Sequence, residues 1–224
     1  MSELTKSFEK SLERFGVPQG GERLSAEELA SYRGKLPNSL LEFWEAHGLG
    51  IWLDGFFQFC NPDKYQSILK FIFAKDNEFK SNRSYVIGMS AFGELLVWNR
   101  DYRIINIDVL YHSVICDELF DPAPEGADID DINVGIAIKN ISDASYDLPD
   151  RDGKPMFKRA LKALGSLDYG EIYALKLHPA LGGPVVVENL GRKKALEALA
   201  IAAQAGPFRL IDASTPQMRV VREI

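Results

Sequence analysis

The chain has 224 residues, of which 46% are hydrophobic and 26% are charged, so it is long enough to bury a substantial core. A formal net charge of -6 and a pI near 5.2 weigh against binding to nucleic acid. Apolar runs stay well short of the roughly 18 residues that cross a membrane, and the N-terminal residues lack the apolar segment of a signal peptide. We therefore expect a globular, cytoplasmic protein of one large or two small domains.

The N-terminal third of the sequence carries mainly helical periodicity. One helix is predicted over 4–15, and a second over 25–32 because Ser-Ala-Glu-Glu forms a capping box there. A third is predicted over 38–47, where a glycine follows and ends it. An Asn-Pro pair at 61–62 caps and opens a fourth helix, which is expected to run to residue 73.

An aromatic hairpin is predicted between the third and fourth helices. Asp54-Gly55 separates the apolar runs 51–53 and 56–60, and such a pair favours a tight turn because both central positions take positive φ. The exposed edge of this turn, at Asp54, is a candidate partner contact.

Beyond residue 84 the apolar residues alternate with a period of two. Strands this short, joined by tight turns, favour an antiparallel meander. Helices followed by strands predict an α+β fold, with N-terminal helices packed on the meander and a smaller helical and β part after it. The strands are expected over 85–89, 94–98, 103–108 and 110–116.

An acidic segment connects the two halves of the sequence. Residues 117–152 contain eleven acidic and two basic residues, a net charge of -9 within a chain of -6. Such a block repels nucleic acid and attracts basic partners, and a solvated linker is an equally good interpretation.

The C-terminal part mixes helices and strands. Residues 191–194, Gly-Arg-Lys-Lys, lie where a helix is expected to begin and are a candidate anion site, although solvated basic residues are the commoner interpretation. The tail from residue 212 is expected to be loosely held. The expected helices are 128–141, 156–164 and 192–205, and the expected strands are 171–177, 185–190 and 208–211.

No motif in the sequence specifies catalysis or metal binding. His47, His112 and His178 lack HxxxH or HExxH spacing, so isolated packing or surface histidines are the favoured interpretation. Cys60 and Cys116 form no CxxC pair and are predicted to be buried, reduced thiols. We therefore predict no catalytic residues, no metal site and no cofactor.

Several longer motifs carry a family resemblance. Residues 15–18 (FGVP), 32–37 (YRGKLP), 40–48 (LLEFWEAHG) and 91–99 (AFGELLVWN) resemble the GAD-like domain. Residues 164–184, LGSLDYGEIYALKLHPALGGP, resemble the domain that follows it in type VI secretion immunity proteins.

The resemblance implies an immunity protein that stays in the cytoplasm and binds the nuclease domain of a cognate toxin, as relatives that neutralise a DNase do. It implies a GAD-like domain over 1–118, an acidic connecting segment with a helix over 119–154, and an immunity-type C-terminal subdomain over 155–224. The family supplies no catalytic motif, and the resemblance implies no direct contact with nucleic acid or membrane.

A nuclease presents basic residues to the phosphate backbone, and an inhibitor can cover that surface with carboxylates. We therefore expect the acidic segment to contribute to the toxin interface. The candidate contacts are Asp117, Glu118, Asp128, Asp130, Asp131 and Asp54.

Two alternatives stay open at this point. One is a small hydrolase-like enzyme with a site between the two halves, which a deep polar cleft with convergent carboxylates or histidines would indicate. The other is a general protein-interaction module, which the absence of a neighbouring toxin gene would indicate. The sequence also leaves open whether the two halves share one sheet.

Overall fold

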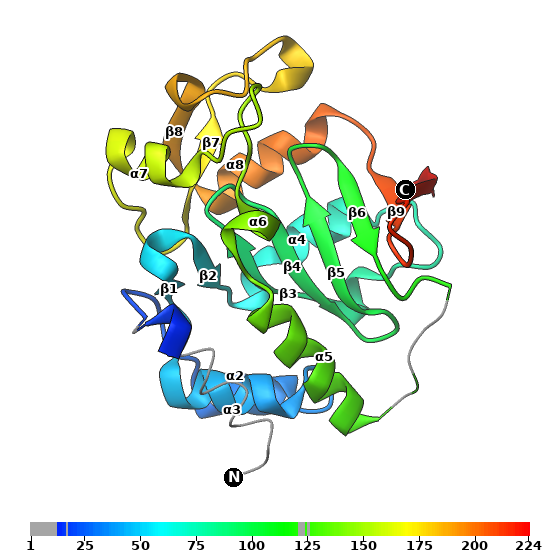
Figure 1. Cartoon of the computed structure of the whole chain (residues 1–224). Coiled ribbons are helices and arrows are strands. Elements are labelled where there is room, and N and C mark those ends of the chain that lie inside the picture. Colours follow the sequence, from blue (N-terminus) through cyan, green and yellow to red (C-terminus); the bar gives the residue numbers. More distant parts are fainter. Residues whose placement is uncertain (1–12, 17, 121–123, 125) are drawn as a thin grey trace.

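The computed structural model describes residues 13–16, 18–120, 124 and 126–224. The helix predicted over 4–15 lies almost entirely outside these residues. An eight-stranded, mostly antiparallel sheet has α5 across one face and α4 across the other (Figure 1). The predicted α+β class is confirmed.

The N-terminal elements follow the local signals closely. Ser25 forms the predicted capping box with Glu28, and the side chain of Asn61 accepts a hydrogen bond from the backbone N–H of Asp63. Gly48, with φ of 75°, ends the third helix. The helices are α2 (Ala26–Tyr32), α3 (Asn38–His47) and α4 (Pro62–Ile72).

The predicted hairpin is present, with a longer loop than the Asp-Gly pair suggests. Trp52 pairs with Phe57, so four residues connect the strands. Leu53 and Asp54 have positive φ (53° and 56°), and Gly55 follows at 100°. A 3-10 turn therefore links β1 (Ile51–Trp52) to β2 (Phe57–Phe59).

The predicted meander is confirmed, and strands from the C-terminal end extend it. The sheet order is β1-β2-β3-β4-β5-β6-β9-β10, and β6 pairs with β9 in parallel. The two halves of the chain thus share one sheet. Its remaining strands are β3 (Ser84–Ser90), β4 (Leu95–Asn99), β5 (Arg103–Asp108), β6 (Ser113–Cys116), β9 (Arg209–Asp212) and β10 (Arg219–Glu223).

Two hydrophobic cores lie on opposite faces of this sheet. Because side chains alternate along a strand, Leu96 and Trp98 of β4 enter one core while Leu95 and Val97 enter the other. Both cores contain residues from the N-terminal and C-terminal parts of the chain, such as Phe157 in the first. Cys60 and Cys116 are buried free thiols, as predicted, and burial raises the pKa of both.

The C-terminal helices are α5 (Ala127–Lys139), α6 (Asp143–Tyr146), α7 (Phe157–Leu164) and α8 (Ala195–Ala202). A separate hairpin of β7 (Glu171–Leu175) and β8 (Leu190–Lys194) stands above the main sheet, beside α8 (Figure 1).

Three C-terminal predictions were wrong. The strand expected over 185–190 lies at Leu190–Lys194 instead, so the helix expected from 192 begins only at Ala195. The tail is not loose, because β10 pairs with β9 and Arg222 forms an ion pair with Asp76 at 3.0 Å. The physical cause is pairing with distant segments, which local periodicity does not reveal.

Candidate functional site

A buried arginine holds two of the six candidate carboxylates. Arg103 begins β5 with φ of 55° and is only 4% exposed. Its Nε lies 2.9 Å from Oδ1 of Asp130, and its Nη1 lies 2.8 Å from Oε2 of Glu118. Its Nη2 also donates to the carbonyl oxygen of Pro124 at 2.6 Å. Glu118 and Asp130 therefore compensate a buried cation.

A third candidate, Asp131, is buried against the start of α3. Its Oδ1 accepts hydrogen bonds from both the backbone N–H and the hydroxyl of Ser39, each at 2.8 Å. The residue that precedes the helix, Pro37, provides no side-chain cap. Asp131 thus caps a helix to which it does not belong, and its negative charge suits that helix end.

The other three candidates are exposed. Asp117 follows β6, Asp128 lies in the first turn of α5, and Asp54 lies on the loop of the β1–β2 hairpin. Neither Asp128 nor Asp130 caps α5 with its side chain, because Gly126 occupies the cap position. Three strands separate β2 from β6, so the fold does not bring Asp54 to the others.

Two further carboxylates, which the sequence does not single out, lie on the face of the sheet that α5 covers. Leu95 pairs with Ile107, so the residues next to them, Glu94 and Asp108, lie opposite each other on adjacent strands. Burial and the charge of Asp108 raise the pKa of Glu94 to about 8. The pKa of Asp108 is raised chiefly by burial, although its carboxylate accepts a hydrogen bond from the backbone N–H of Tyr111 at 3.0 Å.

Asp117 completes this group around Tyr146. Burial and the charge of Glu118 raise the pKa of Asp117. Burial raises the pKa of Tyr146, and the charges of Glu94 and Asp117 raise it further, so both carboxylates lie within electrostatic reach of the Tyr146 hydroxyl. We call Glu94, Asp108 and Asp117 the acidic face. Within the described part of the chain, none of the three forms an ion pair.

The sequence of β5 contains a weak indication of the acidic face. Asn106 and Asp108 alternate with the buried residues Ile105 and Ile107, so the strand carries a polar stripe on the face that a helix should cover. Periodicity marks that stripe as polar, but it does not show which neighbours converge on it.

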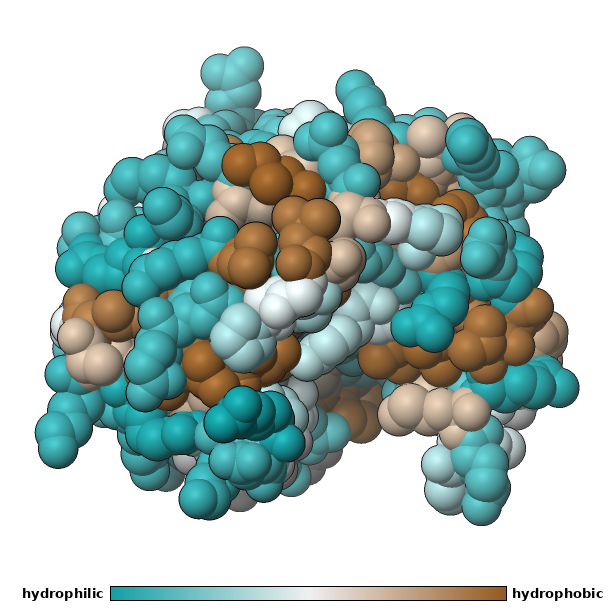
Figure 2. Space-filling model, turned by 90° about the horizontal axis from the view of Figure 1, so that it is seen from above, coloured by the Kyte–Doolittle hydropathy of each residue, from teal (hydrophilic) through white to brown (hydrophobic). Residues whose placement is uncertain are grey.

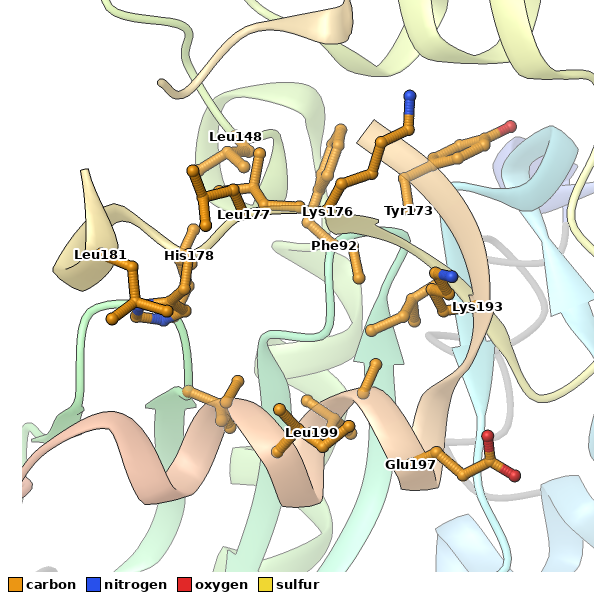
Figure 3. Close-up of a pocket in the computed structure, with 18 residues that line it drawn as sticks. Phe92, Leu148, Tyr173, Lys176, Leu177, His178, Leu181, Lys193, Glu197 and Leu199 are labelled. Atoms are coloured by element: carbon orange, nitrogen blue, oxygen red, sulfur yellow. The ribbon is translucent and has the colours of Figure 1, made fainter. Parts of the chain in front are cut away.

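An apolar groove of about 470 Å³ adjoins the acidic face. It lies between α8 on one side and β7 with the following loop on the other (Figure 3). On the face seen in Figure 2, hydrophobic side chains gather around a hollow within a largely hydrophilic surface. Leu181 and Ile201 line the groove and are 74% and 72% exposed. Other lining residues include Phe92, Leu110, Leu148, Leu177 and Leu199.

Charged and polar groups mark the ends of the groove. His178 and Leu181 lie at one end, and Lys193 and Glu197 lie at the other (Figure 3). Nδ1 of His178 accepts a hydrogen bond from the N–H of Ala180 at 3.2 Å, while its buried Nε2 has no partner among the described residues. Burial lowers the pKa of His178, and so does His112, whose ring centroid is 5.8 Å away.

The candidate anion site at 191–194 is not a helix start. These residues belong to β8, where Arg192 forms ion pairs with Asp168 at 2.9 Å and Glu171 at 2.6 Å. Lys194 also pairs with Glu171 at 3.2 Å. Two of the basic side chains are thus compensated within the chain.

The described residues contain no candidate metal site and no candidate membrane-spanning helix. Among them, no three His, Cys, Asp or Glu side chains are arranged to hold a metal ion. None of the helices that the structure describes combines the length and apolarity that a membrane crossing requires.

The family is decided by similarity to known proteins. Residues 6–111 match the GAD-like domain, and residues 138–205 match the C-terminal domain of the type VI secretion immunity protein Tdi1. A crystal structure of Atu4351 from Agrobacterium tumefaciens is 46% identical over 97% of both chains, with a TM-score of 0.93. The chain belongs to the Tdi1 family of immunity proteins. No curated protein matches it.

The acidic face and the apolar groove draw on different parts of the two regions that match the families. Glu94 and Asp108 lie in the GAD-like region, while Asp117 lies between the two matched regions. The helix and hairpin that form the two sides of the groove lie within the Tdi1 C-terminal region. Phe92 and Leu110 are contributed to the groove by the GAD-like region, so the two family domains build it together.

Proposed function

We propose that this immunity protein neutralises a cognate DNase toxin by covering the basic substrate-binding surface of its nuclease domain with the acidic face. The observation that carries this proposal is that some acidic residues have partners inside the chain, whereas those of the acidic face form no ion pair with the described residues. Glu118, Asp130 and Asp131 are engaged inside the chain. Glu94 and Asp108 are half-buried and Asp117 is exposed, and none of these three has an ion-pair partner among the described residues.

Carboxylates of this kind favour an external cation. Burial penalises the charged forms of all three, and a neighbouring carboxylate adds to the penalty at Glu94 and Asp117. An arginine or lysine from a partner relieves both penalties. A nuclease must expose such side chains to bind the DNA backbone. The exposed charges of Asp117 and Asp128 steer the two proteins together and so accelerate association.

The six carboxylates expected from the sequence then take different roles in the proposal. Asp117 and Asp128, which are exposed, contact the toxin together with Glu94 and Asp108. Glu118, Asp130 and Asp131 contribute by holding α5 and the preceding segment in place. Asp54 lies on the loop between β1 and β2, at a separate part of the sheet. It contacts the toxin only if the interface extends to that loop.

The proposal expects a nuclease toxin to be encoded beside this gene, and association kinetics with that toxin test it. The double variant Asp117→Asn/Asp128→Asn should associate roughly tenfold more slowly at low salt, and the difference should shrink at high salt. The matched control is Glu42→Gln/Glu45→Gln, which removes two exposed charges from α3. Equal association rates for the two double variants would contradict the proposal.

Co-expression provides the cellular test. The wild-type protein should rescue cells from the neighbouring nuclease and should co-purify with it. A hydrolase-like enzyme or a general interaction module would do neither, so this result also separates the proposal from the two alternatives.

A further inference from the structure

We propose that the apolar groove receives an apolar segment of the same toxin, as a second contact beside the acidic face. This inference rests on the proposed function and adds the chemistry of the segment. The toxin segment carries large apolar side chains, with basic residues on the side of the acidic face and an acidic residue near Lys193.

The exposure of the groove residues is the first argument. Leu181 and Ile201, on the two sides of the groove, are 74% and 72% exposed, and Leu177 is 44% exposed. Exposed apolar side chains are common singly, but clusters around a concave surface mark sites of interaction. Because these side chains extend the apolar surface beyond the hollow itself, they favour a protein segment over a small molecule enclosed in the cavity.

Continuity with the acidic face is the second argument. Phe92 and Leu110 line the groove, and each is two residues from a carboxylate of the acidic face, Glu94 and Asp108 respectively. Leu148, which also lines it, is two residues from Tyr146. A partner that docks on the acidic face therefore lies next to the groove.

Charge at the groove ends sets the orientation of the segment. Lys193 lies at the end opposite His178 and forms no ion pair with the described residues. Lys176, which also lines the groove, donates to the carbonyl oxygen of Glu188 at 3.0 Å and keeps its charge uncompensated by any described carboxylate. Glu197 lies at the same end as Lys193, so among these lining residues the two lysines exceed the carboxylates by one positive charge. A segment with one acidic residue near the lysines and basic residues near Asp108 complements this distribution.

The groove is held open by the fold, so little ordering is needed for binding. The backbone N–H of Tyr173 donates to the carbonyl of Ala91 at 2.8 Å, which fixes β7 to the main sheet. Gln58 donates to the carbonyl of Glu171, also at 2.8 Å. A Cβ on Gly183 would lie 1.9 Å from the carbonyl oxygen of Leu177, so the loop after β7 packs tightly on itself. A preformed groove avoids the entropy loss of ordering a loop on binding.

The test measures binding kinetics of full-length variants with the nuclease toxin that the proposed function expects, in a catalytically inactivated form. Leu181→Ser/Ile201→Ser should dissociate at least tenfold faster, with an unchanged association rate and no dependence of this effect on salt. The matched control is Phe71→Ser/Val220→Ser, which removes two exposed apolar side chains elsewhere. Thermal melting of all variants checks that they remain folded.

The outcomes separate the two proposals. If the wild-type protein does not bind the nuclease, the proposed function fails and the groove inference falls with it. If the wild type binds and the groove variant dissociates at the rate of the control, the groove inference alone is wrong. Loss of a dimer in the groove variant, measured by sedimentation without the nuclease, would assign the groove to a second copy and would also overturn it.

Discussion

Asp131 of α5 caps the start of α3 through Ser39, a residue 92 positions earlier in the chain. One carboxylate oxygen accepts both the backbone N–H and the hydroxyl of Ser39 at 2.8 Å. This contact fixes the helix of the acidic segment to the N-terminal helices. It also explains why a residue that charge patterning marks as an interface candidate is buried.

The first prediction concerns this cap. Asp131→Ala should lower the free energy of unfolding by about 1–3 kcal/mol, because it leaves buried donors of Ser39 without an acceptor. Asp131→Asn keeps an acceptor oxygen and should cost less. Chemical denaturation of the two variants measures the difference, and an Ala variant as stable as the wild type would contradict the role of the cap.

The second prediction concerns Arg103. Arg103→Met should destabilise the protein by about 3–5 kcal/mol, because Glu118 and Asp130 lose the guanidinium that they share. The control is Arg100→Met, at an exposed position in the turn between β4 and β5, which should change stability by less than about 0.5 kcal/mol. Urea denaturation compares the two, and similar losses would show that the buried ion pairs are not what stabilises this region.

The third prediction is a pH dependence of stability. The pKa of Glu94 is about 8 in the folded protein and is near 4.5 when exposed, so the folded state binds a proton more tightly than the unfolded state. Its contribution to stability is fully present below pH 4.5 and is lost as pH rises to about 8. Glu94→Gln should remove this slope. Denaturation midpoints at pH 5, 6.5 and 8 test this, and equal slopes in both proteins would contradict it.

The fourth prediction applies the same pKa to toxin binding. A cation placed beside Glu94 favours its ionised form, so binding should release a proton when the free protein holds it. Affinity for the nuclease should therefore rise between pH 6.5 and 8 in the wild type. The rise should be smaller in Glu94→Gln, although Asp108 and Asp117 retain their own raised pKa values. Calorimetry in two buffers of different ionisation enthalpy measures the proton directly.

Much of the N-terminal fold follows from the sequence because its signals are local. The capping box at Ser25, the cap at Asn61 and the period-two alternation from residue 84 each act within a few residues. These elements form where the sequence predicts them. The motifs of the GAD-like and immunity domains likewise identify the family without coordinates.

Only the tertiary structure decides which carboxylates are available to a partner. Charge patterning treats Asp117 and Asp131 alike, since both lie in the same acidic segment. Their fates differ because the fold brings the start of α3 to Asp131, while it leaves Asp117 beside the carboxylates of Glu118 and Asp212 and without an ion-pair partner among the described residues. The tertiary structure also decides the state of the basic residues in β8. They lie in a strand because β8 pairs with β7, and Glu171 of β7 forms an ion pair with Arg192. Charge and periodicity are local properties, whereas the partner that neutralises a charge or completes a strand comes from distant parts of the chain.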